Sequence, residues 1–170
     1  LTGLLAFGSP QPDLAGSSSF NDFSPRAVLT YKLSPDVNFY ASIARGYKAG
    51  GNNLNGSLPQ HVRPFAPEKA WNYEVGFKSE FWDHRALLNG SVFYMKWSDL
   101  QSDVIYLIDP TDISSAVSLT ESAANATSKG IDLEARFRPI EPLTLGFTLG
   151  YLDATFGKFP NAVVYSNEVD

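Results

Sequence analysis

The chain has 170 residues, a net charge of −5, 14% aromatic residues and no cysteine. The lack of cysteine excludes disulfide bonds, thiolate catalysis and cysteine-ligated zinc, and the acidic charge argues against nucleic acid as a partner. No apolar run approaches the roughly 18 residues of a transmembrane helix. Abundant Tyr, Phe, Gly, Ser and Thr residues indicate a β-rich protein.

The first part of the chain predicts a loop and a hairpin. Residues 1–21 are rich in Pro, Gly and Ser, which predicts the remnant of a strand followed by a loop. Residues 23–33 alternate between apolar and polar side chains, a period of two that is typical of a half-buried strand. A Ser-Pro-Asp turn follows, and residues 37–48 alternate again. Residues 49–69 then hold so many Gly, Asn and Pro residues that we expect a long and functional loop.

The clearest alternation lies in the middle of the chain. Residues 71–81 and 86–100 form two predicted strands around a short polar turn. Each is about eleven residues or longer, and roughly 9–11 tilted residues cross the hydrocarbon of a bilayer. Trp71 and Tyr94 lie towards the strand ends on the apolar parity. Aromatic girdles of this kind are typical of outer-membrane barrels.

The last hairpin follows another long polar segment, residues 101–127, which we expect to be a loop. Residues 130–138 and 143–151 alternate around a turn that contains two prolines. On the first of these strands the polar parity is fully charged. That pattern suits a hydrated lumen better than a lipid-facing or core position.

Six strands in three hairpins are therefore predicted, with short turns at one end and two long connections at the other. This asymmetry is typical of a transmembrane barrel. The predicted fold is all-β, an antiparallel up-and-down meander of about six barrel strands. A soluble two-sheet sandwich with the same alternation is the alternative fold.

Several motifs add a family resemblance. They occur in one order along nearly the whole chain: FSPR at 23–26, YASIARGYKAGG at 40–51, PE at 67–68, YEVGFK at 73–78, DLQ at 99–101 and SKGIDLE at 128–134. With these motifs the chain resembles the barrel of TonB-dependent outer-membrane receptors. The resemblance implies a barrel of about 22 strands, of which residues 1–170 form a part within the C-terminal half. It also implies an N-terminal plug and a TonB box, both expected outside this chain.

The resemblance further implies a location in the bacterial outer membrane and TonB-energised uptake of a scarce nutrient such as a ferric siderophore. The expected partners are a small-molecule nutrient or metal chelate, outer-membrane lipid, and the TonB complex through the absent N-terminal part. We expect ligand contacts in residues 46–69 and 101–127, where no motif identifies a site. The candidates are aromatic and amide side chains: Asn52, Asn53, Gln60, Phe65 and Tyr106.

No cofactor, metal site or catalytic site is predicted. His61 and His84 lack Asp or Glu residues at ligand spacing, and no nucleophile motif accompanies the serines. The carboxylates on the polar parity are expected to pair with Lys78, Arg136 and Arg138, or with basic groups on a plug. The alternative functions are a passive porin-like or adhesion barrel and a soluble carbohydrate-binding sandwich.

Overall fold

A computed structural model describes residues 18–157, apart from the side chain of Ala123. The strand remnant predicted within residues 1–21 falls mostly outside this range. The described elements are β1 (Arg26–Lys32), β2 (Val37–Lys48), β3 (Gly51–Asn52), η1 (Gln60–Val62), β4 (Pro64–Phe65), β5 (Glu68–Phe81), β6 (Ala86–Leu107), η2 (Ile113–Ser115), β7 (Ala116–Ile140) and β8 (Leu143–Phe156). In the described part, no helix is long and apolar enough to cross a membrane.

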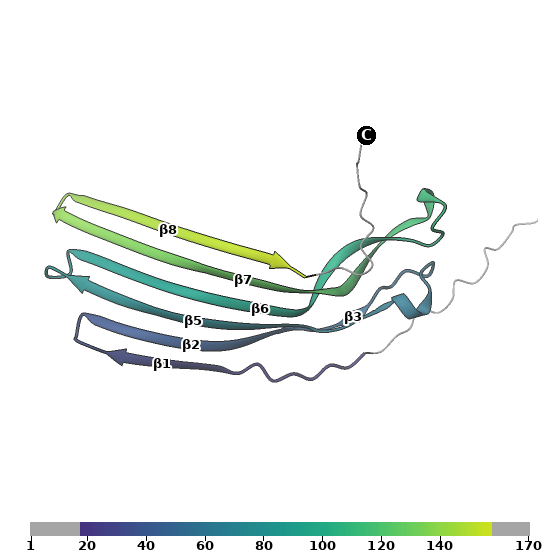
Figure 1. The fold of residues 1–170 in the computed structure, drawn as a ribbon, viewed down its shortest axis with the longest axis horizontal. Coiled ribbons are helices and arrows are strands. Elements are labelled where there is room, and N and C mark those ends of the chain that lie inside the picture. The colour runs from purple at the N-terminus through teal and green to yellow at the C-terminus, as the bar shows by residue number, and fades with distance from the viewer. Residues whose placement is uncertain (1–17, 158–170) are drawn as a thin grey trace, which may run out of the picture.

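The main sheet is a curved antiparallel meander with the strand order β1-β2-β5-β6-β7-β8 (Figure 1). Each strand of this sheet pairs with the next one along the chain, and the short β3–β4 pair forms a separate ladder between β2 and β5. The predicted all-β meander of six long strands is thus confirmed. Within residues 18–157 the sheet stays open, with β1 and β8 as its edges.

Tight turns join the strands at one end. Leu33 N donates to Val37 O at 3.0 Å around the first turn, and Arg85 N donates to Trp82 O at 3.1 Å around the second. In the second turn, Trp82 has a left-handed φ of 52°. These are the turns expected from the sequence, and we call this end of the sheet the turn end.

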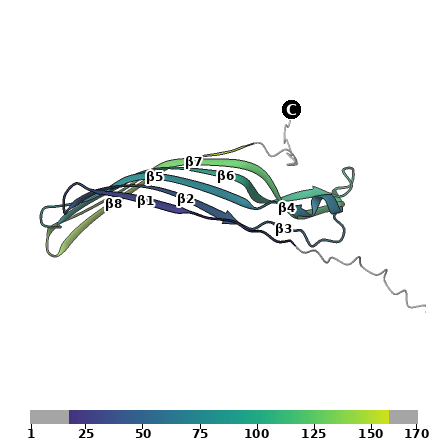
Figure 2. The same ribbon diagram turned by 90° about the horizontal axis from the view of Figure 1, so that it is seen from below.

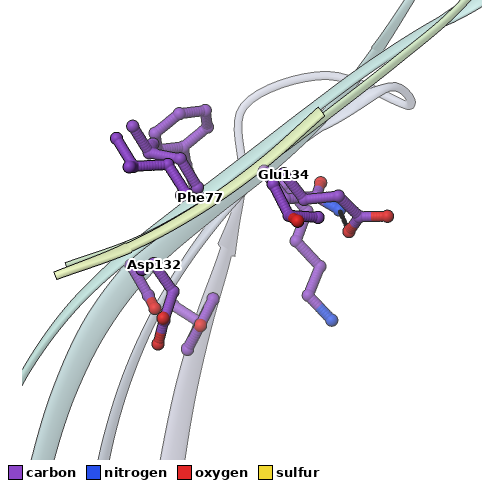
Figure 3. Close-up of a pocket in the computed structure, with 12 residues that line it drawn as sticks. Phe77, Asp132 and Glu134 are labelled. Carbon is purple, nitrogen blue, oxygen red and sulfur yellow. Dashed lines mark hydrogen bonds between the residues drawn. The ribbon is translucent and has the colours of Figure 1, made fainter. Parts of the chain in front are cut away.

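The two faces of the sheet differ in chemistry, as the alternation predicts. One register row crosses the apolar face through Leu29, Ala41, Val75, Val92, Ile131 and Tyr151. The neighbouring row crosses the polar face through Thr30, Tyr40, Gly76, Ser91, Asp132 and Gly150. Figure 3 shows Phe77 on one side of the sheet and Asp132 and Glu134 on the other.

The apolar face has the dimensions of a bilayer core. Along β5 it extends from Trp71 to Phe81, which corresponds to about 33 Å of strand at about 3.3 Å per residue. With the usual barrel tilt of about 40° this gives a band about 25 Å tall, the height of the apolar belt of outer-membrane barrels.

The prediction of a loop across residues 101–127 is wrong. β6 continues to Leu107 and β7 begins at Ala116, so only residues 108–115 connect them. A register shift after Trp97, with a left-handed φ of 56° at Asp99, interrupts the ladder before it resumes. This bulge and the many polar residues beyond it hide the alternation in the sequence. The extended hairpin bends away from the sheet (Figures 1 and 2).

Buried hydrophobic side chains lie at the end opposite the turns. They are Leu58, Leu119, Ala124 and Ala126. Residues 49–67 and the outer part of the β6–β7 hairpin, residues 100–124, contain the first three, and we call these two segments the loop unit. The remaining sheet, from the turn end to the bulge at Asp99, is called the wall.

Candidate functional site

The centre of the polar face holds a hydrogen-bonded carboxylate. Tyr40 Oη donates to Glu74 Oε1 at 2.5 Å, and Lys78 Nζ lies 5.9 Å from the centre of the Tyr40 ring. Gly76 makes this arrangement possible, because a Cβ atom there would lie 2.8 Å from the Tyr40 ring. The tyrosine therefore lies flat across the neighbouring strand.

A polar hollow of about 350 Å³ adjoins this pair, between β2, β5, β6, β7 and β8. Asn89 Nδ2 donates to Glu134 Oε2 at 3.0 Å on one side of it, and Asp132 lies on the other (Figure 3). The hollow is open, and its lining carries carboxylate, amide and hydroxyl groups together with the ammonium group of Lys78. Such a surface can hold water and polar solutes.

The carboxylates of the polar face do not form the ion pairs predicted within the sheet, and their pairing with basic groups on a plug stays a prediction. Among the described residues, no ion pair joins them to Lys78, Arg136 or Arg138. Tyr40 and Asn89 bind two of the carboxylates instead, and His84 binds the carboxylate of Glu80. The cross-strand partners of two of these basic residues are neutral: Asn38 and Asn89 for Lys78, and Leu87 and Gly146 for Arg136.

A second hollow, of about 300 Å³, lies at the loop end of the wall. Its lining comes from β6, β7 and β8 and is mostly apolar: Trp97, Leu100, Ala126, Leu152, Ala154 and Phe156, with Thr127, Ser128 and Thr155 between them. The register places Trp97, Leu152 and Ala154 on the same parity as the polar face. An apolar surface therefore follows the polar hollow along the same face of the sheet.

Sequence reasoning did not identify this apolar hollow. The signal lies in Phe93, Met95 and Trp97, which interrupt the polar parity of β6 near its loop end. On β8 the same break occurs at Leu152. Large apolar residues on a parity that is otherwise polar indicate apolar surface on that face, and the pairing of three strands brings them together into one hollow.

Residues 49–67 are fixed to the β6–β7 hairpin by hydrogen bonds between side chains and backbone. Asn53 Oδ1 accepts from Thr120 N and its Nδ2 donates to Thr120 O, both at 2.8 Å. Gln101 Nε2 donates to Ala49 O at 2.9 Å and to Ala66 O at 3.1 Å. The side-chain amide of Asn53 thus makes the same two hydrogen bonds to Thr120 that the backbone of a paired strand would make. Residues 49–67 are thus joined to the outer hairpin at two levels.

The tip of the β6–β7 hairpin is stabilised by two aspartates. Asp109 Oδ1 accepts from Thr111 N at 2.9 Å, and Asp112 Oδ1 accepts from Ser114 N at 2.8 Å, where it caps η2. Hydrogen bonds from Thr111 and from Ser114 lower the pKa of Asp109 and of Asp112 respectively. Both carboxylates are exposed and organise the tip locally.

The candidate ligand residues occupy different environments. Asn52 donates to Ser18 Oγ at 2.7 Å, and Asn53 has its amide engaged with Thr120 and with Arg63 O. The ring of Phe65 lies over Gly51, where an added Cβ would approach it to 2.6 Å. The remaining two are Gln60, exposed on η1, and Tyr106, opposite Val117 on β6. The structure brings Asn52, Asn53 and Phe65 together around β3 and β4, while Tyr106 lies farther out on the hairpin. Ligand binding by all five remains a prediction.

Within the described residues there is no group of three or more His, Asp or Glu side chains that could hold a metal ion. The side chains that come together on the polar face offer hydrogen bonds and apolar contact. They suit the binding of polar and apolar groups.

Comparison with known proteins agrees with this geometry. The family model described as TonB dependent receptor-like, beta-barrel, matches residues 6–169. The pesticin receptor of Yersinia enterocolitica is 30% identical over 131 residues, which cover 77% of this chain and 18% of the receptor. The metal-pseudopaline receptor CntO of Pseudomonas aeruginosa is 27% identical over 139 residues, covering 81% of this chain and 18% of the receptor.

Solved structures show the same fold. The ferric yersiniabactin uptake receptor FyuA from Yersinia pestis superimposes with a TM-score of 0.59 at 24% identity, covering 78% of this chain and 18% of that one. The alcaligin outer-membrane receptor FauA from Bordetella pertussis gives a TM-score of 0.54 at 20% identity, covering 85% and 24%. The chain spans about 18% of the length of the curated relatives it matches. It belongs to the TonB-dependent receptor family and forms part of the receptor's β-barrel in the outer membrane of Gram-negative bacteria.

Proposed function

We propose that this chain is part of the wall of a receptor that takes up a metal chelate, such as a ferric siderophore, with energy from the TonB complex. The ligand is captured at the loop end and passes along the polar face, which lines the lumen. The observation that carries the proposal is the apolar hollow around Trp97 on the lumen side, which adjoins the loop unit along β7.

The chemistry of the two hollows supports this assignment. Ligand sites combine apolar surface with a few placed polar groups, and here the apolar hollow follows the polar one along a single face. A metal chelate has both kinds of surface, because its organic arms surround a polar metal centre. The relatives' names point the same way, since one is a receptor for a metal complex of pseudopaline.

The test uses the full-length receptor in a strain that lacks its own receptors for the same chelates. Cells are given the iron-loaded forms of yersiniabactin, a hydroxamate siderophore and a catecholate siderophore, and binding and uptake of radioactive iron are measured. We expect Trp97→Ala to weaken binding of one chelate at least about tenfold, as loss of a buried aromatic contact does. Phe23→Ala is the control, because this exposed aromatic residue lies outside the hollow.

Deletion of tonB distinguishes uptake by a TonB-dependent receptor from passive passage. Uptake should stop and binding should persist in the deletion strain. A passive porin-like barrel would continue to transport the chelate without TonB. If no chelate binds, or if Trp97→Ala and Phe23→Ala behave alike, the proposed role of the apolar hollow is refuted.

A further inference from the structure

A glutamine side chain lies where β2, β5 and β6 separate at the loop end of the sheet. β2 ends and β5 begins here, on either side of residues 49–67, and the ladder between β6 and β7 shifts register after Trp97. Gln101 lies at this junction. Its Nε2 atom donates to Ala49 O at 2.9 Å and to Ala66 O at 3.1 Å.

One amide group therefore fastens both ends of the same loop. Residues 49–67 leave the sheet at Ala49 and return towards it at Ala66, and a glutamine NH2 group has a hydrogen for each of these carbonyl oxygens. The two ends are in close contact, since a Cβ atom added at Gly50 would lie 3.0 Å from the carbonyl carbon of Ala66. Ser122 Oγ on β7 also donates to Ala66 O, at 2.8 Å. The base of the loop is thus held by β6 and β7 together.

The backbone of Gln101 is fixed as well. Glu68 Oε2, at the start of β5, accepts from Gln101 N at 3.1 Å. This carboxylate takes the place of a ladder partner beyond Ser98, the last residue of β6 that pairs with β5. Three of the motifs that carry the family resemblance meet in these contacts: YASIARGYKAGG, PE and DLQ.

The same junction carries one side of the apolar hollow. Leu100, which lines the hollow, directly precedes Gln101, and Trp97 lies just before the bulge. Asp99 between them has a left-handed φ of 56°, a conformation that residues other than glycine rarely adopt and that surrounding contacts must maintain. The hydrogen bonds of Gln101 hold the chain directly after this residue. Fixing Gln101 therefore fixes the backbone that presents Trp97 and Leu100 to the hollow.

We propose that Gln101 is a positioning residue of the chelate site. It holds residues 49–67 and the bulge in one arrangement, so that the loop and the apolar hollow are presented to the ligand together. This role rests on the proposed function, in which the ligand is a metal chelate. Without the Gln101 amide, loop and hollow would move independently, and the ligand would meet the binding-competent arrangement for only part of the time.

The first measurement needs no ligand. Spin labels are attached to Leu54→Cys in the loop and Leu29→Cys on β1 of the full-length receptor, both at exposed positions, and pulsed EPR records the distances between them. We expect Gln101→Glu, which keeps the shape of the side chain and removes its donor hydrogens, to widen the distance distribution. Gln101→Ala should widen it without adding a charge. Asn21→Asp, the same change of amide to carboxylate at an exposed position before β1, should leave it unchanged.

The second measurement follows dissociation of the iron chelate that the wild-type receptor binds. Gln101→Glu should speed dissociation about fivefold, as expected for the loss of two hydrogen bonds of ordinary strength. The rate of TonB-dependent uptake at saturating chelate should not change. In a Trp97→Ala background the same substitution should have little further effect, because the surface that Gln101 positions is gone.

An unchanged distance distribution in both Gln101→Glu and Gln101→Ala would overturn the proposal, as would an equal widening in Asn21→Asp. Additive effects of Gln101→Glu and Trp97→Ala on dissociation would show that Gln101 does not act through the hollow. If the wild-type receptor binds none of the chelates, the proposed function fails, and the distance measurement alone decides whether Gln101 positions the loop.

Discussion

The wall and the loop unit are held together by different means. In the wall, long backbone ladders join strands whose large apolar side chains point outward, so that Val75 and Phe147 remain half exposed or more in this chain. In the loop unit, Leu58 and Leu119 are buried, and side chains such as Asn53 bind backbone groups of another segment. The wall depends on lipid and neighbouring strands for its environment. The loop unit buries its own apolar side chains, such as Leu58 and Leu119.

The wall and the loop unit therefore differ in how strictly each position specifies its residue. Any apolar residue serves on a lipid-facing position, so the wall tolerates change within a simple alternation. The part-buried amide of Asn53, with three backbone partners, tolerates almost no change, because an unpaired polar group is costly. Sequence alternation therefore describes the wall well and the loop unit poorly.

The largest expected effect is a charge on the apolar face. Val75→Arg should block assembly of the full-length receptor, because an arginine facing lipid near the midplane costs roughly 2–4 kcal/mol. Thr148→Arg, on the polar face beside Glu134, should assemble normally. Heat-modifiability on gels reports assembly. Failure of Thr148→Arg with normal assembly of Val75→Arg would reverse the assignment of the two faces.

The next effect concerns close contacts within the wall. At Gly130 an added Cβ would lie 2.2 Å from Tyr151 O and 2.6 Å from the Phe93 ring, whereas Gly146 has nothing within 4 Å. Gly130→Ala should therefore lower the free energy of unfolding by about 1–3 kcal/mol, and Gly146→Ala should change it little. Urea unfolding of the receptor in detergent measures both. Equal effects would show that the wall adapts to added volume.

Close contacts of this kind also make Gly76 unsuitable as a control position on the polar face. Any side chain there must displace the Tyr40 ring or approach Gly90 O. Of the polar-face positions on β8, Thr148 and Gly146 are the better controls.

In the loop unit the Asn53 amide is the most sensitive contact. Asn53→Ala leaves the Thr120 N–H and two backbone carbonyls without this partner, which should destabilise the docked loop locally by about 1–3 kcal/mol. Hydrogen exchange at Thr120 should then speed up, while the wall amides keep their protection. Gln60→Ala, on the exposed η1, is the control. Unchanged exchange at Thr120 would mean that residues 49–67 are held by other contacts.

The smallest effect lies at the turn end. The hydrogen bond and charge of Glu80 raise the pKa of His84. Because the pKa of His84 is higher in the folded protein, its contact with Glu80 contributes its full stabilisation of the fold below the unfolded pKa of about 6.5. This stabilisation is lost as the pH rises through the pKa of His84 in the folded protein. In Glu80→Gln the pKa of His84 should return towards 6.5, as a histidine NMR titration would show. A pKa that does not change would contradict the contact.

The limits of sequence reasoning follow the same division. The alternation predicted the six main strands, their turns and the two faces, because one parity must suit lipid and the other water. It missed the continuation of β6 to Leu107, since the bulge at Asp99 shifts the register. It also missed the apolar hollow, because Trp97 and Leu152 come together only through the pairing of three strands. The role of the five loop candidates could not be derived from composition.

The central claim is that the loop unit and the turns lie on opposite sides of the outer membrane. Leu54 in the loop unit and Trp82 at the turn end are equally exposed, at 71% each, so cysteines at the two positions differ only in location. On whole cells, an impermeant thiol reagent should label Leu54→Cys and leave Trp82→Cys unlabelled until the membrane is permeabilised. Equal labelling of both on intact cells, or labelling of Trp82→Cys alone, would contradict the account.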